Sequence, residues 1–196
     1  MWKAATSSSL SKAMSTRRDI LLAGGGLLGG LILPSVSPGY SSAKMVEIHM
    51  RSDADGAHVG FDPIGILVEP GQTVRWICDA NVHTTAAYHP KNDNHSLRIP
   101  VAAQPWGSDY LQAGESFEVR LTDEGVYDYF CLPHEMAGMV GRLIVGKPSG
   151  PGALPYDYFV SEGRPWTPVP PEAQNAFPSI EEILQKKIVR SSAIFS

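Results

Sequence analysis

Apolar and polar residues alternate along several short segments between residues 44 and 147. In "MVEIHM" (45–50) the apolar Val46, Ile48 and Met50 are separated by polar residues, and "FEVRL" (117–121) repeats the pattern. An apolar residue at every second position is typical of a β-strand with one buried face. Short strands separated by turns predict an all-β fold, a sandwich or a barrel, rather than parallel βαβ units. Four further segments read as strands: "IGILVE" (64–69), "TVRWIC" (73–78), "VYDYFC" (126–131) and "VGRLIV" (140–145).

Two regions depart from this pattern. Residues 79–116 lack steady periodicity and contain three prolines, so we expect them to form loops. Beyond residue 147 the composition changes, and residues 165–178 hold five prolines, which predicts an extended segment lying on a surface or acting as a spacer.

The last patterned segment, "SIEEILQKKIVR" (179–190), predicts a helix. Ser179 and Glu182 have the spacing of a capping box. An apolar stripe follows, made of Ile180, Ile183, Leu184 and Ile188. A stripe this small is expected to pack on its own domain, with a partner surface as the alternative.

The N-terminal segment "TRRDILLAGGGLLGGLIL" (16–33) places two arginines before a short apolar run. The run is shorter than the roughly 20 residues that a membrane span needs. It is typical of a twin-arginine export signal, with "SSA" (41–43) as a cleavage site. We therefore predict an export signal at 1–43, a main domain at 44–147 and a C-terminal extension at 148–196. The mature protein would lie in the periplasm or cell envelope without stable membrane insertion; an uncleaved anchor is the alternative.

The net charge of the chain limits the kinds of molecule that it is expected to bind. Without residues 1–43 the chain has 12 basic and 19 acidic residues, a formal charge of −7. No basic patch remains, which argues against nucleic acid as a partner. An acidic surface favours cationic partners.

Candidate chemistry is concentrated between the last two predicted strands. Cys131, His134 and Met139 follow the spacing C-x2-H-x4-M. Thiolate and thioether sulfur favour copper(I), and imidazole binds either oxidation state of copper, so the spacing predicts a copper site. Met136 is a second candidate for the thioether ligand, although it should lie at the tip of the loop. A Cys78–Cys131 disulfide is the competing interpretation for an exported chain, but Cys78 is expected to be a buried thiol of the core.

A second imidazole must come from outside this loop. Among the remaining histidines, His83 follows a buried strand, and a strand end holds a ligand rigidly. His89 and His95 lie in the polar segment "YHPKNDNHS" (88–96) and are expected to face solvent. The other two, His49 and His58, are expected on a strand face and in a loop.

Two segments resemble those of the cupredoxins, in particular the plastocyanin and pseudoazurin group. They are "EPGQTVRWICDANVH" (69–83) and "YDYFCLPHEMAGMVGRLIVG" (127–146). The resemblance implies a Greek-key β-sandwich and one type 1 copper ion held by His83, Cys131, His134 and Met139. The chain departs from the family at Thr84, where the family often places an asparagine that braces the ligand loops. Residues 84–110 and the C-terminal extension have no counterpart in a minimal plastocyanin.

The resemblance implies a one-electron carrier that exchanges electrons with a redox protein such as a cytochrome or a reductase. Pro133, Glu135 and Met136 are predicted to surround an exposed edge of His134 and to form the docking surface. An enzyme is not expected, because three strong ligands and a weak axial one leave no open position for substrate. Two alternatives remain: a copper storage or delivery protein, and a structural zinc site built from Cys78, His83, Cys131 and His134.

Overall fold

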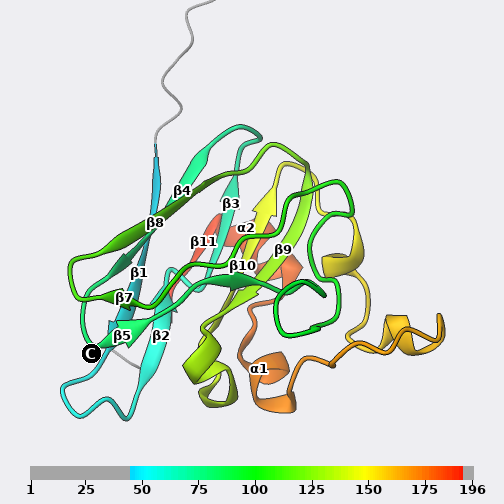
Figure 1. The fold of residues 1–196 in the computed structure, drawn as a ribbon. Helices are drawn as coiled ribbons and strands as arrows, with labels where there is room; N and C mark the ends of the chain where they lie inside the picture. The colour runs from blue at the N-terminus through cyan, green and yellow to red at the C-terminus, as the bar shows by residue number, and fades with distance from the viewer. Residues whose placement is uncertain (1–44, 192–196) are drawn as a thin grey trace, which may run out of the picture. The chain divides into compact units, whose positions relative to one another are not determined.

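The computed structural model describes residues 45–191, and these form a two-sheet β-sandwich (Figure 1). The first sheet has the order β2-β1-β4-β8, in which β1 runs parallel to β4 and antiparallel to β2. The strands are β1 (Val46–Ser52), β2 (Val59–Asp62), β4 (Thr73–Cys78) and β8 (Ser116–Arg120). The predicted alternation is confirmed in β4, where Val74, Trp76 and Cys78 are fully buried.

The second sheet has the order β11-β3-β10-β9-β6, and a separate pair joins β5 to β7. Its strands are β3 (Gly65–Val68), β6 (Ala86–Ala87), β9 (Gly125–Phe130), β10 (Val140–Val145) and β11 (Ile188–Val189). The pair is β5 (Val82–His83) and β7 (Leu111–Gln112). The helices are η1 (Leu132–Ala137), η2 (Pro151–Ala153), η3 (Tyr158–Val160), α1 (Pro171–Ala176) and α2 (Ile180–Lys186). The prediction of an all-β sandwich is confirmed.

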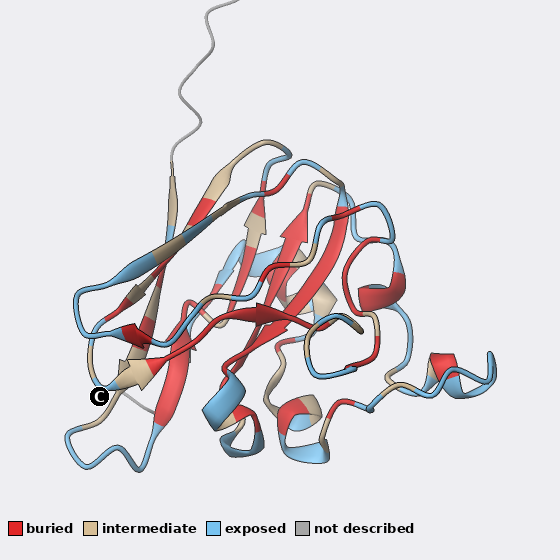
Figure 2. Cartoon of the chain, viewed as in Figure 1, coloured by how far each residue is buried: buried red, intermediate tan, exposed pale blue. Residues whose placement is uncertain are grey.

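The central strands β9 and β10 are buried at every position, so both of their faces are covered (Figure 2). Their inner face packs against the first sheet. Their outer face is covered by the C-terminal extension, in part through Ile183, and by the insertion 84–110, in part through Tyr88. The extension therefore packs on its own domain, as the apolar stripe predicted, and forms a third layer.

The predicted helix at 179–190 is correct at its start and wrong at its end. Ser179 caps α2, since its side-chain oxygen accepts a hydrogen bond of 3.0 Å from the backbone N–H of Glu182. The helix stops at Lys186, Lys187 has a φ of +65°, and β11 then pairs with β3. Strand β3 would otherwise be an edge strand, and pairing satisfies its backbone groups. This gain in hydrogen bonding explains why the chain leaves the helix before Ile188, which is 45% exposed.

The proline-rich segment is also less extended than predicted. It contains α1, which packs against η1, the short helix of the predicted copper loop. The two helices lie side by side at one end of the molecule (Figure 1). The contact is close, because a Cβ atom added at Gly138 would lie 3.3 Å from that of Ala176. The extension thus reaches the predicted metal site.

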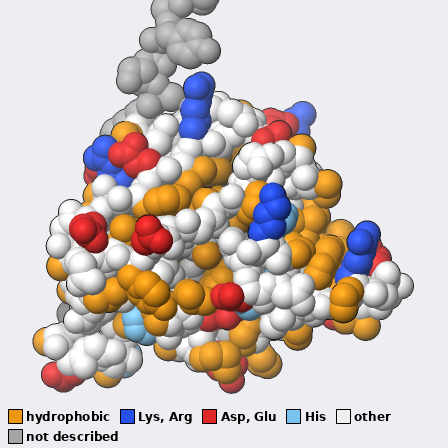
Figure 3. All heavy atoms as spheres, in the orientation of Figure 1, with side chains coloured by type: hydrophobic (Ala, Val, Ile, Leu, Met, Phe, Trp, Pro, Cys, Tyr) orange, Lys and Arg blue, Asp and Glu red, His pale blue; other side chains and the backbone are white. Residues whose placement is uncertain are grey.

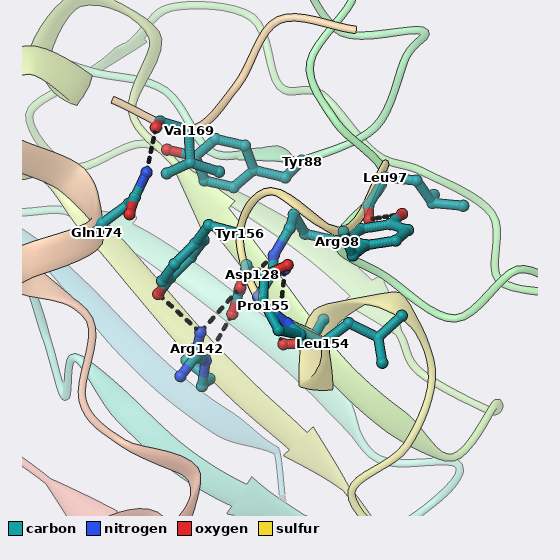
Figure 4. A network of polar contacts seen from close by, with 12 residues as sticks. Tyr88, Leu97, Arg98, Asp128, Arg142, Leu154, Pro155, Tyr156, Val169 and Gln174 are labelled. Carbon is teal, nitrogen blue, oxygen red and sulfur yellow. Dashed lines mark hydrogen bonds and ion pairs between the residues drawn. The ribbon is translucent and has the colours of Figure 1, made fainter. Parts of the chain in front are cut away.

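A buried ion cluster joins the extension to the sandwich (Figure 4). Asp128 of β9 is fully buried and accepts hydrogen bonds from Arg98 of the insertion, at 3.1 Å, and from Arg142 of β10, at 2.7 Å. Both arginines also donate to the extension. Their acceptors are the carbonyl oxygens of Gly152, Leu154, Pro155 and Pro178 and the hydroxyl of Tyr156.

The predicted export signal at 1–43 lies outside the described residues. Among residues 45–191, no helix is long and apolar enough to cross a membrane.

Candidate metal centre

The loop between β9 and β10 folds back on itself and brings its two ends together. The backbone N–H of Cys131 donates to the carbonyl of Met139 at 3.0 Å, and that of Met139 donates to the carbonyl of His134 at 3.1 Å. Gly138 has a φ of +78°, a left-handed conformation that glycine adopts without steric cost. The loop therefore returns Met139 to the vicinity of Cys131, as the sequence predicted.

His83 joins this loop from the end of β5. Its Nδ1 lies 3.2 Å from Nδ1 of His134 and 3.8 Å from Sγ of Cys131, and the latter two atoms are 3.4 Å apart. Within residues 45–191, these three residues are the one group of three or more His, Cys, Asp or Glu side chains arranged to hold a metal ion. The structure thus brings together three of the four expected ligands.

Burial sets the protonation of all three side chains. It lowers the pKa of His83 to about 4, with the neighbouring His134 adding to the shift, and it also lowers the pKa of His134. Burial raises the pKa of the Cys131 thiol, although the hydrogen bonds from Thr84 oppose this. Two neutral imidazoles therefore face a buried sulfur. One thiol sulfur and two imidazole nitrogens are the strong donors of a type 1 copper site, and a bound cation would favour the thiolate.

Two hydroxyl groups support these side chains. Ser52 Oγ lies 2.9 Å from Nε2 of His83. When Nε2 donates its proton to this oxygen, Nδ1 is left with a lone pair for a metal. Ser52 was not found from the sequence, where its one signal is a polar residue at the end of a strand.

Thr84, which stands where the resemblance suggested an asparagine, contacts the loop that carries Cys131. Its backbone N–H points at Sγ of Cys131 at 3.3 Å, and its hydroxyl oxygen accepts a hydrogen bond of 2.8 Å from the N–H of Leu132. One residue therefore connects the segment that carries His83 to the loop that carries Cys131.

Comparison with known proteins agrees with this geometry. The family of copper binding proteins described as the plastocyanin/azurin family matches residues 48–146. The chain belongs to this family.

Individual cupredoxins show the extent of the likeness. The plastocyanin of Chlamydomonas reinhardtii is 35% identical over 105 residues, which are 53% of this chain and 70% of that protein. The pseudoazurin of Methylorubrum extorquens is 28% identical over 108 residues, which are 54% of this chain and 65% of that protein, slightly under two thirds. A solved structure of a pseudoazurin from Sinorhizobium is 25% identical, with a TM-score of 0.50, and covers 72% of this chain and 94% of that one.

The two methionines of this cupredoxin loop differ in burial. Met139 is fully buried, whereas Met136 is 64% exposed at the outer side of η1. Burial suits an axial ligand beneath a metal and favours Met139, whose assignment stays a prediction. Cys78 is a fully buried free thiol and Cys131 is free as well, so the two form no disulfide. Cys78 also lies outside the group of three side chains that could hold a metal ion, which leaves the alternative zinc set without its fourth member.

The remaining histidines do not join the site. His49 pairs with Asp79 and His58 with Asp53, at 2.8 and 2.7 Å. The prediction that His95 faces solvent is wrong, because this residue is 4% exposed and its ring packs on that of Phe130 with centroids 4.6 Å apart. The insertion folds back onto the sheet, which the polar composition of the segment did not indicate.

The prediction that Glu135 lies on the docking surface is also wrong, because it assumed that this side chain is exposed. Glu135 is 9% exposed, and its carboxylate accepts a hydrogen bond of 2.6 Å from the hydroxyl of Tyr88. The insertion covers this side of η1. Glu135 therefore cannot present its charge to a partner.

The opposite side of η1 is exposed and mostly apolar. Leu132 is 44% and Met136 64% exposed, and Pro133 and Ala137 are exposed beside them. His134, in the middle of this group, is partly exposed. Hydrophobic side chains gather at the end of the molecule where η1 and α1 lie (Figure 3).

Proposed function

We propose that this cupredoxin carries single electrons between redox proteins, with one type 1 copper ion held by His83, Cys131, His134 and Met139. The convergence of three donor atoms within 3.8 Å of one another, two from fully buried side chains and one from the partly exposed His134, carries this proposal. A bound copper ion supplies a one-electron couple between its two oxidation states. Membership of the plastocyanin/azurin family supports the same function.

The role of the chain is to hold the ligands in place. Backbone hydrogen bonds close the loop between Cys131 and Met139, and Ser52 and Thr84 fix the side chains around them. Side chains held in this way need little rearrangement when the charge of the metal changes. Four protein ligands leave no open position for a substrate, which argues against an enzyme.

We further propose that the partner docks on the exposed side of η1, over Pro133 and Met136 and around the edge of His134. A contiguous apolar surface commonly marks a contact site, and transient redox encounters use small interfaces. Since Glu135 is buried, steering would come from the overall charge of −7 that remains without residues 1–43. Such a charge suits a positively charged cytochrome or reductase. Export to the periplasm or cell envelope through a twin-arginine signal completes the proposal and rests on the sequence alone.

Copper titration tests the proposal. Copper(II) added to the purified full chain should give an intense blue or green colour that a reductant bleaches and an oxidant restores. A copper storage or delivery protein would bind copper(I) without this stable, reversible colour, and a zinc protein would stay colourless. Either outcome would remove the electron-carrier function.

Variants then test the ligands. Cys131→Ser should abolish the colour, because the visible band requires the bond between thiolate and copper. His83→Ala should weaken or open the site, while His89→Ala, a histidine of the insertion that does not reach the site, should leave the absorption spectrum unchanged. The reverse result for these two histidines would contradict the assignment of His83.

A further inference from the structure

A buried polar group connects the insertion to the ligand loop. The carboxylate of Glu135 accepts the 2.6 Å hydrogen bond from Tyr88 through Oε1, and its Oε2 lies 3.4 Å from Nε2 of His95. Tyr88, His95 and Glu135 are 0%, 4% and 9% exposed. Glu135 directly follows His134 in the chain, so this group holds the loop next to an expected copper ligand.

Tyr88 and His95 also contact Phe130, the residue before Cys131, which is another expected copper ligand. Phe130 directly precedes Cys131, and its ring centroid lies 4.6 Å from those of both Tyr88 and His95. The rings of Tyr88 and His95 are themselves 5.1 Å apart. The contacts therefore reach both ends of the segment Cys131–His134.

The insertion is itself fixed to the rest of the molecule, so it can act as a support. The backbone N–H of Tyr88 donates to the carbonyl of Asp128 in β9 at 3.0 Å, and its carbonyl accepts from the N–H of Arg98 at 2.9 Å. The segment after His95 is held to the extension, because the N–H of Ser96 donates to the carbonyl of Thr167 at 2.9 Å.

The burial of Glu135 indicates that these contacts matter for the loop. A carboxylate removed from water is destabilising unless hydrogen bonds compensate for its lost hydration. Within the described residues 45–191, Nδ1 of His95 has no hydrogen-bond partner, so the polar contact of this ring is made through Nε2 to Glu135. Helix η1 has only six residues of 3-10 geometry, which few backbone hydrogen bonds hold.

We propose that Tyr88 and His95, acting through Glu135, are positioning residues for the copper loop. They fix η1 from its buried side, so that His134 and Met139 keep one arrangement whether or not metal is bound. The inference rests on the proposed function in so far as His134 and Met139 are copper ligands, but the fixation itself is a property of the chain without metal.

The first test uses the metal-free full chain. Tyr88→Phe removes the hydroxyl and keeps the ring contacts. The matched control is Tyr127→Phe, which removes the hydroxyl of another buried tyrosine, one that donates to the carbonyl of Asp123 at 2.7 Å. Hydrogen exchange is measured at the backbone amides of Gly138 and Met139, which close η1.

Tyr88→Phe should accelerate exchange at these two amides by about tenfold, the order expected when a buried hydrogen bond is lost. Tyr127→Phe should leave both amides at the rate of the parent protein. Parent rates in Tyr88→Phe, or equal acceleration in the control, would overturn the proposal.

The second test uses the copper-loaded full chain and adds Glu135→Gln, which keeps the size of the side chain. Loss of an outer contact of a metal ligand typically weakens metal affinity by roughly tenfold or more. We expect that loss in both Tyr88→Phe and Glu135→Gln, together with a shifted absorption band and reduction potential, and no change in Tyr127→Phe. Parent affinity, spectrum and potential in both variants would overturn the proposal. A parent chain that takes up no copper, while Tyr88→Phe still loosens η1, would instead count against the proposed function.

Discussion

At the scale of single residues, the site depends on where each side chain is buried. His83, Cys131 and Met139 are fully buried, whereas Met136, three residues before Met139, is exposed. The two methionines have the same chemistry and differ in exposure, which gives a matched pair for testing the axial ligand.

Met139→Leu should keep copper and colour but raise the reduction potential, since a thioether ligand is lost and the site becomes more apolar. Met136→Leu should shift the potential much less, because the side chain is exposed. Voltammetry of the two variants gives the comparison. A larger shift for Met136→Leu would contradict the axial assignment of Met139.

The buried His83 also makes the stability of the metal-free protein depend on pH. Burial lowers its pKa to about 4 in the folded chain, against about 6.5 in the unfolded chain. Between these values the unfolded chain binds more protons, so the free energy of unfolding should fall as the pH is lowered from 6.5 towards 4. Above pH 6.5 the contribution is complete and constant.

Urea unfolding of the metal-free chain at several pH values measures this effect. His83→Asn removes the titrating group and should flatten part of the decline. A variant that declines as steeply as the parent protein would assign the effect to other groups.

At the scale of elements, the features that could be predicted are those set by residues close together in the sequence. The spacing of Cys131, His134 and Met139 lies within one loop, and the strands carry period-two patterns, so both could be read directly. His83 required the further step of placing a ligand at the end of a buried strand. The capping box at Ser179 marked the start of α2 for the same local reason.

Contacts between distant segments could not be read in this way. The burial of Glu135 and His95 depends on how residues 84–110 fold back over η1, and their polar composition gives no sign of it. The end of α2 was missed because β3 offers free backbone groups to β11, a preference set by the sheet and not by residues 187–189.

The ion cluster makes the attachment of the extension testable. Arg142→Met removes donors to Asp128, Tyr156 and the carbonyl of Pro178, while Arg98 continues to pair with the aspartate. Breaking a buried ion pair from one side typically costs about 3–5 kcal/mol. We expect thermal unfolding at a clearly lower temperature and faster proteolysis of residues 165–190. Arg164→Met is the control, because this arginine is 57% exposed and pairs with Glu162 at the surface.

At the scale of the whole molecule, the three layers leave one side of η1 open to partners. The insertion covers its buried side and α1 packs beside it, so Met136 and Pro133 lie on the side that remains accessible. Electron exchange is therefore expected through this surface and the edge of His134.

Met136→Lys should leave the absorption spectrum and reduction potential unchanged, because the side chain is 64% exposed. It should slow electron exchange with a positively charged redox partner several-fold by introducing repulsion into the contact. Stopped-flow kinetics at several ionic strengths measures the rate. Ile188→Lys, at an exposed site on β11, is the control, and a parent rate in Met136→Lys would move docking to another face.

The hydrogen bonds from Arg98 and Arg142 to the extension limit which sequence changes that segment can accept. Four of their contacts end on main-chain oxygens, those of Gly152, Leu154, Pro155 and Pro178, which every amino acid possesses. Replacing a side chain there leaves the acceptor in place, whereas inserting or deleting one residue moves every later oxygen away from its guanidinium. The extension should therefore tolerate amino-acid substitutions far better than insertions or deletions.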